Sequence, residues 1–327
     1  MKFTFNLINV GLGNNGGSFS LVRSANVLSN LGHEVIIIDS VKNQHTWTPL
    51  LVKHIIIKDV KDIPDADILI GTGFKSYKST IELPDRCGKK AIWIRGYELW
   101  QASEKEIINI LSNKKVTKIV NSFGLQNKLK QFNIESYIVR PGNDFENFYP
   151  LNIRDDSKIV LGALYHTRHK TKRTDMAIQI SNILKSKYKN IELWMFGTNK
   201  DSKNPNIDKY IQLPNMEEKN KFYNSVDIWL STSDLEGLHI VPQEAMLTEC
   251  VVVTSNAELA GTSDYIINNE TGLVADNNLK SFVKQTEKLI LDSNLRRTLG
   301  VKGKNKIIEL GSREENMKKM VELFRKV

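Results

Sequence analysis

Two carboxylates in the second half of the chain, Glu236 and Glu244, stand eight positions apart in a pattern that could bind one polar ligand. The apolar run at 227–230 predicts a buried strand before Glu236, and residues 241–248 predict a helix that carries Glu244. One acid would then lie at the carboxyl end of a strand and the other about two helical turns later. The helix start between them offers unpaired N–H groups, which suit an anion. Acids for hydroxyls and amides for phosphate are what a nucleotide sugar requires.

A strongly basic loop comes earlier in the same half. The run at 158–164 predicts a buried strand, and apolar residues in helical spacing after position 175 predict an amphipathic helix. Between residues 157 and 190 there are eight Lys or Arg residues against one acid. Four of them lie between the strand and the helix: Arg168, Lys170, Lys172 and Arg173. Because arginine and lysine both bind phosphate strongly, this loop could clamp a pyrophosphate; solvated charges or nucleic-acid contacts are the alternatives.

A glycine-rich turn follows the first predicted strand. Residues 3–10 read as a buried strand, glycines follow at once, and a helix at 18–31 leads to a second strand that stops at Asp39. The pattern Gly-x-Gly-x-x-Gly with an acid some way downstream is typical of dinucleotide-binding enzymes. Glycine turns at a first strand serve many doubly wound folds, however, and a tight turn without a ligand is the alternative.

The order of these features resembles the donor-site signature of glycosyltransferase family 4, whose members are retaining enzymes of the GT-B fold. The matching residues are Ser233-x-x-Glu236-Gly237, Glu244-Ala245-Met246, Gly261-x-x-Asp264 and Thr271-Gly272-Leu273-Val274. The resemblance implies an α/β chain with two Rossmann-like, doubly wound parallel-sheet domains facing across a cleft. It also implies metal-independent transfer of a hexosyl unit from a nucleotide diphosphate sugar, most fittingly a UDP-sugar, with retention and without a further cofactor.

The same resemblance gives the two carboxylates their roles. Glu244 would accept hydrogen bonds from the ribose hydroxyls of the donor. Glu236, with the backbone amides around Gly237 and Leu238, would face the sugar ring. His239 follows closely enough to touch the donor as well, although scattered core or surface histidines are the commoner case.

The phosphate-binding roles fall on the basic loop and on glycines. By the resemblance, Arg168 and Lys172 would hold the donor diphosphate and stabilise the negative charge that builds on the departing nucleotide. Lys170 and Arg173 of the same loop are alternatives to Lys172 as the residue that reaches the phosphate. The pair Gly16 and Gly17 would let the chain approach the donor diphosphate and the acceptor. Gly197, at the end of a predicted strand, would let the base or ribose of the donor come close to the backbone.

One family feature is absent from the first half. Many relatives carry a histidine that contacts the transferred sugar after the strand predicted here at residues 91–94, and this chain has none there. Arg95, Tyr97 or Glu98 would take that role. The aromatic rings of Trp93, Tyr97 and Trp100 could form an acceptor platform, or could simply be buried.

Proline and glycine residues that interrupt regular structure predict the domain boundary. A Pro-Gly turn at 141–142 leads to a Phe-x-Pro segment at 148–150, which resembles the interdomain passage of the family. We therefore predict an acceptor-binding domain at 1–146 and a donor-binding domain at 147–311. Residues 312–327 are expected to form a helix that crosses back and packs on the first domain.

Composition describes an ordinary globular chain of 327 residues with room for two cores, at 40% hydrophobic and 25% charged residues. No apolar run has the length of a membrane span, which predicts a cytoplasmic protein, or one held peripherally at the inner membrane surface. The cysteines, Cys87 and Cys250, match no metal spacing and are expected to be reduced thiols. The sequence leaves the oligomeric state open.

A net charge of +9 points to anionic partners. Lysines without an intervening acid are concentrated in one segment: Lys114, Lys115, Lys118, Lys128 and Lys130. Such a patch favours an anionic membrane, a phosphorylated or lipid-linked glycan acceptor, or DNA, including a hydroxymethylated base as acceptor; a solvated face is the alternative.

Two rival functions stay open on the sequence alone. The glycine turn and Asp39 would suit an NAD-dependent oxidoreductase, which leaves the two-acid signature and the basic loop unexplained. The net charge would suit a non-catalytic nucleic-acid binder, with salt-sensitive DNA binding and no turnover of any nucleotide sugar.

Overall fold

The computed structural model describes residues 1–199 and 204–327, which form two compact units. Unit 1 comprises Met1–Gly142 and Ser312–Val327, and unit 2 comprises Asn143–Gly311. The boundary expected after residue 146 lies four positions beyond this division, and the C-terminal helix belongs to unit 1.

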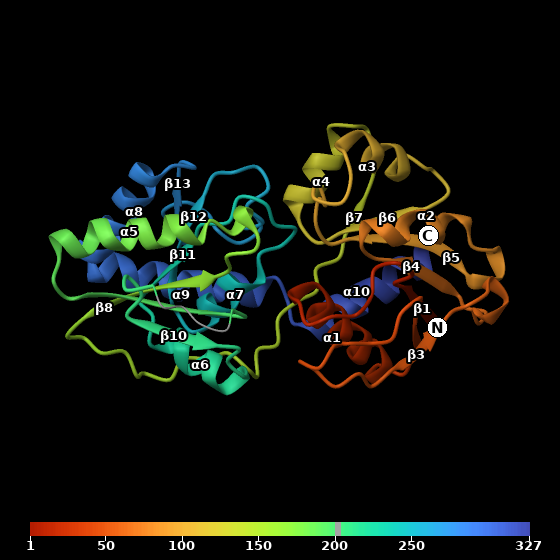
Figure 1. Cartoon of the computed structure of the whole chain (residues 1–327), viewed down its shortest axis with the longest axis horizontal. Helices are drawn as coiled ribbons and strands as arrows, with labels where there is room; N and C mark the ends of the chain where they lie inside the picture. The colour runs from red at the N-terminus through yellow and green to blue at the C-terminus, as the bar shows by residue number, and fades with distance from the viewer. Residues whose placement is uncertain (200–203) are drawn as a thin grey trace. The chain divides into compact units, whose positions relative to one another are not determined.

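Unit 1 is built on a seven-stranded parallel sheet in the order β3-β2-β1-β4-β5-β6-β7 (Figure 1). Its strands are β1 (Lys2–Asn6), β2 (Glu34–Asp39), β3 (Lys53–Ile56), β4 (Ile68–Gly71), β5 (Lys89–Ile94), β6 (Thr117–Val120) and β7 (Tyr137–Ile138). The helices that connect parallel strands cover both faces of the central strands, so these strands read as nearly continuous apolar runs. The strand predicted at 3–10 ends at Asn6, whose side-chain Nδ2 donates to Thr80 Oγ1 at 2.9 Å.

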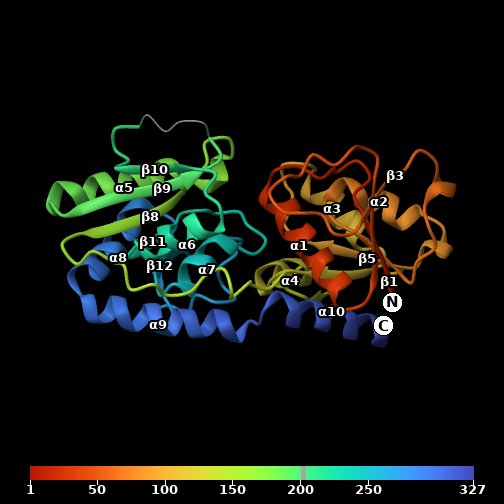
Figure 2. The ribbon, with the colours of Figure 1, turned by 90° about the horizontal axis from the view of Figure 1, so that it is seen from below.

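The helices of unit 1 lie on both faces of this sheet. They are α1 (Gly16–Asn30), α2 (Phe74–Glu82), α3 (Glu104–Leu111), α4 (Phe123–Lys130) and α10 (Arg313–Lys326), with short 3-10 turns at Val60–Asp62 and Asp85–Cys87. Figure 2 shows α10 alongside α1. Met317 and Phe324 of α10 pack with Phe3 in the core. The side-chain Nη1 of Arg313 donates to Ser24 Oγ of α1 at 3.1 Å, so residues far apart in sequence close this unit.

Unit 2 repeats the architecture with a six-stranded parallel sheet in the order β10-β9-β8-β11-β12-β13. Its strands are β8 (Ile159–Tyr165), β9 (Ile191–Gly197), β10 (Lys209–Gln212), β11 (Ile228–Ser231), β12 (Val251–Ser255) and β13 (Leu273–Ala275). Its helices are α5 (Thr174–Lys187), α6 (Met216–Asn224), α7 (Ile240–Leu247), α8 (Leu279–Leu291) and α9 (Ser293–Glu309), with a 3-10 turn at Lys170–Lys172. None of the helices in the described parts of the chain is both long and apolar enough to cross a membrane.

Alternate residues of each strand in unit 2 serve cores on opposite faces of its sheet. Leu161 and Leu230 pack with α5 and α8, whereas Val160 and Trp229 pack with α6, α7 and α9. This alternation follows from the two-residue period of a strand. Gly162 lies opposite Trp229 in register, and a Cβ there would come within 2.9 Å of the indole.

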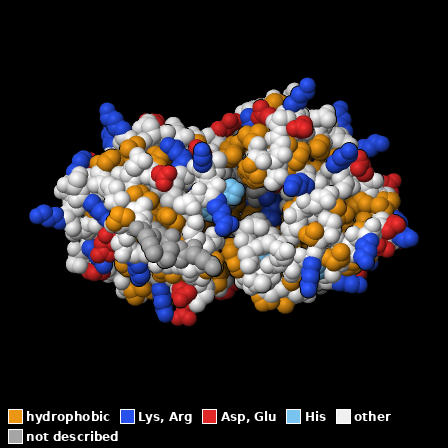
Figure 3. All heavy atoms as spheres, in the orientation of Figure 1, with side chains coloured by type: hydrophobic (Ala, Val, Ile, Leu, Met, Phe, Trp, Pro, Cys, Tyr) orange, Lys and Arg blue, Asp and Glu red, His pale blue; other side chains and the backbone are white. Residues whose placement is uncertain are grey.

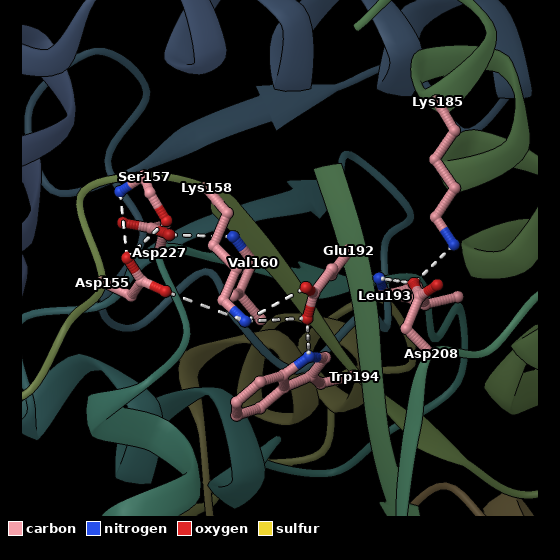
Figure 4. Close-up of polar contacts among 10 residues, drawn as sticks. All are labelled: Asp155, Ser157, Lys158, Val160, Lys185, Glu192, Leu193, Trp194, Asp208 and Asp227. Carbon is pink, nitrogen blue, oxygen red and sulfur yellow. Dashed lines mark hydrogen bonds and ion pairs between the residues drawn. The ribbon is translucent and has the colours of Figure 1, made fainter. Parts of the chain in front are cut away.

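A polar network closes the amino-terminal side of this sheet (Figure 4). The Lys158 ammonium donates to Glu192 Oε1 at 3.0 Å, and Trp194 Nε1 donates to Glu192 Oε2 at 2.6 Å, which joins β8 to β9. The carboxylate of Asp227 accepts from the N–H of Val160 at 2.8 Å. Burial raises the pKa of Asp227, while the N–H bond from Val160 opposes that shift. The network fixes strand register at the edge opposite the predicted site.

Candidate functional site

The predicted site lies at the topological switch point of unit 2. From β8 the chain builds outward through β9 and β10 on one side, and through β11, β12 and β13 on the other. The loops after β8 and β11 therefore leave neighbouring strands at the carboxyl edge of the sheet and diverge. In open parallel sheets, ligands bind at this position. These loops contain the basic run 166–173 and the acid-bearing run 232–239.

Hydrogen bonds tie these two loops together. Thr232 Oγ1 donates to the carbonyl oxygens of Lys172 and Arg173 at 3.1 and 3.2 Å. The N–H of Asp234 donates to the Thr171 carbonyl at 3.0 Å. The backbone of the basic loop is thus positioned by the loop after β11, which a strand-and-loop reading of the sequence could not show.

The basic loop ends at the uncapped start of α5. Arg173, the residue before α5, has a left-handed backbone (φ 50°, ψ 42°), and no side chain caps the helix. The N–H of Met176 donates to the Arg173 carbonyl at 3.0 Å, so the N–H groups of Thr174 and Asp175 are the ones left for solvent or an anion. A surface depression of about 440 Å³ opens here. Its lining residues are His166, Thr167, His169, Lys170, Arg173, Thr174, Asp175, Met176, Gln179 and Leu279.

Lys172 and Glu236 form the central ion pair of the site. Lys172 Nζ lies 2.5 Å from Glu236 Oε1, and only 13% of the glutamate side chain is exposed. Burial alone would raise the pKa of Glu236, but His239, Lys172 and a hydrogen bond from Ser233 outweigh it, so the pKa of this carboxyl lies below its ordinary value. The structure thus brings together two residues predicted separately, a phosphate ligand and a sugar-facing acid, with the carboxylate ionised at neutral pH.

His239 adds a buried neutral imidazole beside this pair. Its Nδ1 lies 3.0 Å from Ser231 Oγ, and its Nε2 lies 3.5 Å from Glu236 Oε1 without the alignment of a hydrogen bond. Burial lowers the pKa of His239 to about 4, with the charge of Lys172 acting in the same direction and Glu236 opposing. The imidazole is therefore uncharged at neutral pH and can offer a hydrogen bond without adding charge.

A third loop holds the acid-bearing loop from the other side. The N–H of Glu236 donates to the Leu259 carbonyl at 2.7 Å, and the N–H of His239 donates to the Gly261 carbonyl at 2.9 Å. Gly261 has a φ of +71°, and a Cβ there would lie 2.7 Å from Glu236 Cβ. Only glycine combines that backbone with so close an approach. The small residue of the Gly-x-x-Asp pattern thus positions Glu236.

Glu244 is already paired within the protein. Its Oε2 accepts from the Tyr223 hydroxyl at 2.7 Å and lies 2.6 Å from Lys219 Nζ, and 5% of its side chain is exposed. Lys219 and Tyr223 stand four residues apart on one face of α6. The sequence reading missed both residues. Their helical spacing was a usable signal, but their pairing with Glu244 depends on tertiary packing.

The remaining predicted donor residues are spread over the same edge of unit 2. Arg168 is exposed and forms no hydrogen bond or ion pair with any described residue. Gly197 ends β9, where a Cβ would lie 2.1 Å from the Tyr165 carbonyl oxygen. Gly237 and Leu238 are buried next to Glu236. Their roles toward a donor stay predictions.

The glycine turn of unit 1 is shaped by side-chain caps. Asn15 caps α1 by accepting from the N–H of Ser18 at 2.9 Å, beside Gly16 and Gly17. A Cβ added at Gly16 would meet nothing within 4 Å, so packing does not require glycine there. Asp39, the acid of the dinucleotide pattern, is fully buried and accepts from the N–H of Ser40 at 2.7 Å. Its Oδ2 has no hydrogen-bond partner, but the complete burial of the side chain keeps it from a ribose.

The structure decides between alternatives for two groups of side chains in unit 1. Of the two alternatives for the aromatic rings, burial is confirmed for Trp93 and Tyr97, and an acceptor platform is left to Trp100, whose side chain is 56% exposed. The five-lysine patch is smaller than expected. Lys118 is buried and donates to a backbone carbonyl, and Lys128 pairs with a glutamate of α3 at 3.0 Å. On the face drawn in Figure 3, Lys and Arg side chains are scattered rather than gathered.

Metal-ligand geometry and cysteine chemistry add no further site. Within residues 1–199 and 204–327, no group of three or more His, Cys, Asp or Glu side chains is arranged to hold a metal ion. Both cysteines, Cys87 and Cys250, are free and buried.

Comparison with known proteins links this geometry to sugar transfer. Residues 144–306 match the family described as glycosyl transferases group 1. The capsular polysaccharide biosynthesis glycosyltransferase CapM of Staphylococcus aureus is 28% identical over 143 residues, covering 40% of this chain and 36% of that protein. The poly(ribitol-phosphate) alpha-N-acetylglucosaminyltransferase of S. aureus is 27% identical over 165 residues, covering 47% and 33%. The matches span about a third of each curated relative.

Solved structures share the fold over the whole chain. HepE from Anabaena in complex with UDP gives a TM-score of 0.79 at 11% identity, with 100% of both chains covered. Sucrose-phosphate synthase from Thermosynechococcus elongatus gives 0.75 at 16% identity, covering 100% of this chain and 98% of that one. The predicted fold class, two Rossmann-like parallel-sheet α/β domains of the GT-B type, is confirmed.

Proposed function

Residues 144–306 form a glycosyl transferases group 1 domain, and from this premise we propose that the chain is a retaining glycosyltransferase. It moves a hexosyl unit from a nucleoside diphosphate sugar, bound by unit 2, to a hydroxyl acceptor. The observation that carries this proposal is the convergence of Lys172 and Glu236 at the switch point of unit 2, beside the uncapped start of α5. A cation for the pyrophosphate and an acid for the sugar meet at one edge of one sheet.

The donor phosphates fit the basic loop. Lys172 and Arg168 supply positive charge, and the N–H groups of Thr174 and Asp175 at the start of α5 add hydrogen-bond donors. As the bond to the sugar breaks, negative charge builds on the departing nucleotide, and these groups stabilise it. Because side chains and amides provide this charge, we propose that transfer requires no divalent metal. Lys172 leaves Glu236 as it engages the phosphate, which frees the carboxylate to accept from a sugar hydroxyl.

The carboxylates orient the two ends of the donor. Glu236 faces the sugar with the amides of Gly237 and Leu238, and the neutral His239 supports it without competing charge. Glu244 receives the ribose hydroxyls, and its bonds from Tyr223 and Lys219 fix the carboxylate beforehand. Retention then follows from attack on the face of the leaving group, where a donor phosphate oxygen accepts the acceptor proton.

UDP is the nucleotide that the comparisons favour. HepE, which shares the fold, is solved with UDP-glucose. The curated relatives act in capsular polysaccharide biosynthesis and on poly(ribitol-phosphate), so we propose a glycan of the cell envelope as acceptor. Transfer to a DNA base or action at a membrane surface now has less support, because two lysines of the 114–130 patch serve internal contacts.

A donor panel tests the proposal. UDP-, GDP-, ADP- and TDP-sugars are added to the full chain, and thermal unfolding is followed. A bound donor at 100 times its Kd stabilises the fold by about 2.7 kcal/mol. Lys172→Met should abolish most of the shift, whereas Lys187→Met, which removes an equal charge from a surface ion pair on α5, should keep it. No shift with any nucleotide sugar, or equal shifts in both variants, would contradict the proposed site.

A transfer assay tests the stereochemistry. With the donor and acceptor that give product, proton NMR of the newly formed linkage reports its anomeric configuration. An α-linked donor should give an α-linked product without added divalent metal. A β-linked product would contradict retention, and loss of activity on chelation would contradict metal independence.

A further inference from the structure

Arg95 carries a guanidinium without a protein partner. The residue follows β5, and its Nε is buried without a hydrogen bond. Its recorded side-chain contact is with the ring of Trp93, whose centroid lies 5.3 Å from Arg95 Cζ. No acceptor within residues 1–199 and 204–327 takes a hydrogen bond from its guanidinium. Buried polar groups are nearly always satisfied, so an unpaired arginine requires a reason.

Two other buried polar atoms without partners surround Arg95. The Tyr77 hydroxyl on α2 is unpaired, and the residue is 2% exposed. Asn121 follows β6 and is 4% exposed; its Nδ2 donates to the Arg95 carbonyl at 3.4 Å, and its Oδ1 is unpaired. In the sheet, β4, which leads into α2, and β6 flank β5 (Figure 1), so the residues that follow these three strands share one carboxyl edge. Donors and an acceptor thus converge on one place.

The charges around Arg95 favour an anion. Burial and the charge of Arg313 together lower the pKa of Arg95 to about 10, with the charge of Glu98 opposing, so the guanidinium stays charged at neutral pH. The nearby acid, Glu98, makes no ion pair with Arg95 and instead accepts from the N–H of Phe74, at the start of α2, at 3.1 Å. Arg95 is half-buried and its buried Nε has no acceptor, so an incoming anion supplies the hydrogen bond that the protein leaves unmade.

We propose that Arg95, with Tyr77 and Asn121, forms an oxyanion-binding subsite in unit 1 that takes a phosphate or carboxylate group of the acceptor. The planar fork of arginine matches two oxygens of such a group. Tyr77 donates a further hydrogen bond, and Asn121 Oδ1 accepts one from an adjacent hydroxyl. The identification of the ligand as an acceptor rests on the proposed function, in which unit 2 holds the donor.

Phosphate titration tests the subsite with the full chain. Inorganic phosphate is titrated by calorimetry while saturating UDP occupies unit 2. Arg95→Gln should weaken phosphate affinity about 10- to 100-fold, as expected for losing charge-assisted hydrogen bonds. The control is Arg86→Gln, which removes an equal charge from unit 1 but breaks bonds to Asp65 and to the Val60 carbonyl. Its phosphate affinity should match that of the wild type.

Stability separates a ligand-binding role from a structural one. Without phosphate, Arg95→Gln should unfold at the same or a higher urea concentration than the wild type, because no hydrogen bond of the guanidinium is lost. Arg86→Gln should unfold at a lower urea concentration than the wild type, because it loses its hydrogen bonds to Asp65 and Val60. Equal phosphate affinity in Arg95→Gln and the wild type would overturn the subsite, and so would a loss of stability in Arg95→Gln.

Two further measurements keep this result independent of the proposed function. If UDP does not bind, the proposed function fails, and the phosphate titration is repeated without UDP in a Lys172→Met background, where Arg95→Gln should still lower the affinity. If transfer is observed, Arg95→Gln should raise the KM of the acceptor and leave the KM of the donor unchanged. A changed donor KM with an unchanged acceptor KM would contradict the assignment to the acceptor.

Discussion

His239 links the geometry of the site to a measurable pH dependence of stability. The imidazole is buried between Ser231 and Glu236, and burial lowers its pKa from 6.5 to about 4. When unit 2 unfolds, the ring returns to water and regains its ordinary pKa. The perturbation is therefore acidification of the wild type from pH 7 to pH 4, compared with the same change in His239→Gln, which has no proton to gain.

The sign and the size of this change in stability with pH follow from proton linkage. Between pH 6.5 and about 4 the unfolded state holds a proton on His239 that the folded state lacks, so protons favour unfolding. The stabilisation is complete above pH 6.5 and is lost as the pH falls toward 4. At about 1.4 kcal/mol per pH unit, the loss reaches about 3 kcal/mol. Carboxylates that do not lie beside His239 add the same slope in both proteins and cancel, so the difference reports His239 together with Glu236, whose pKa His239 lowers.

Hydrogen exchange resolved by peptide measures this difference within unit 2. The free energy of opening for β11 and β12 is compared between wild type and His239→Gln at pH 7, 6, 5 and 4.5, after correction for the intrinsic exchange rate. The free energy of opening of the wild type minus that of His239→Gln should fall by more than 2 kcal/mol between pH 7 and pH 4.5. Below pH 6.5 the fall should be on the order of 1.4 kcal/mol per pH unit. Peptides of unit 1 serve as the internal control and should not differ. A difference that stays constant with pH would refute the buried neutral imidazole.

Three other predictions concern Glu244, two glycines and Arg168. Glu244→Gln leaves the ammonium of Lys219 without its ion pair and should lower the free energy of unfolding by about 3–5 kcal/mol in urea titration; a loss below about 1 kcal/mol would show that the pair is not formed. Gly197→Ala should cost about 1–3 kcal/mol or more because its Cβ would meet a carbonyl oxygen, whereas Gly16→Ala, with open space around it, should not destabilise; equal effects would contradict this packing. Arg168→Ala should lower kcat more than it weakens donor binding in a transfer assay, and a pure rise in donor KM would count against its role at the leaving group.

Most of the fold could be predicted from the sequence because strands and helices are marked by local patterns of residues. Apolar runs bounded by glycine and proline predicted the buried central strands, since such strands are covered on both faces. β10 was missed because its four residues are only partly buried or exposed and leave no apolar run. The predicted first strand ran four residues too long, since the apolar stretch continues past Asn6 into a turn in which the N–H of Val10 donates to the Leu7 carbonyl.

The functional site, too, could be predicted only in part. Residue type and spacing singled out Glu236, Glu244 and the basic loop, because these follow predicted strands and helices in order. Their partners could not be found this way. The pairing of Glu244 with Lys219 depends on how α6 packs against α7. Lys128 does not belong to the exposed basic patch because it forms an ion pair with Glu104 of α3. Long-range contacts decide which charges are available to a ligand, and a linear pattern does not contain them.

Photoaffinity labelling tests the central claim most directly. The full chain is irradiated with an azido derivative of the UDP-sugar that stabilises it best, with and without excess unmodified donor, and labelled peptides are identified by mass spectrometry. The account predicts donor-protected labelling in unit 2, within residues 166–173 or 232–244. Labelling confined to the glycine turn at residues 11–17 of unit 1 would contradict it.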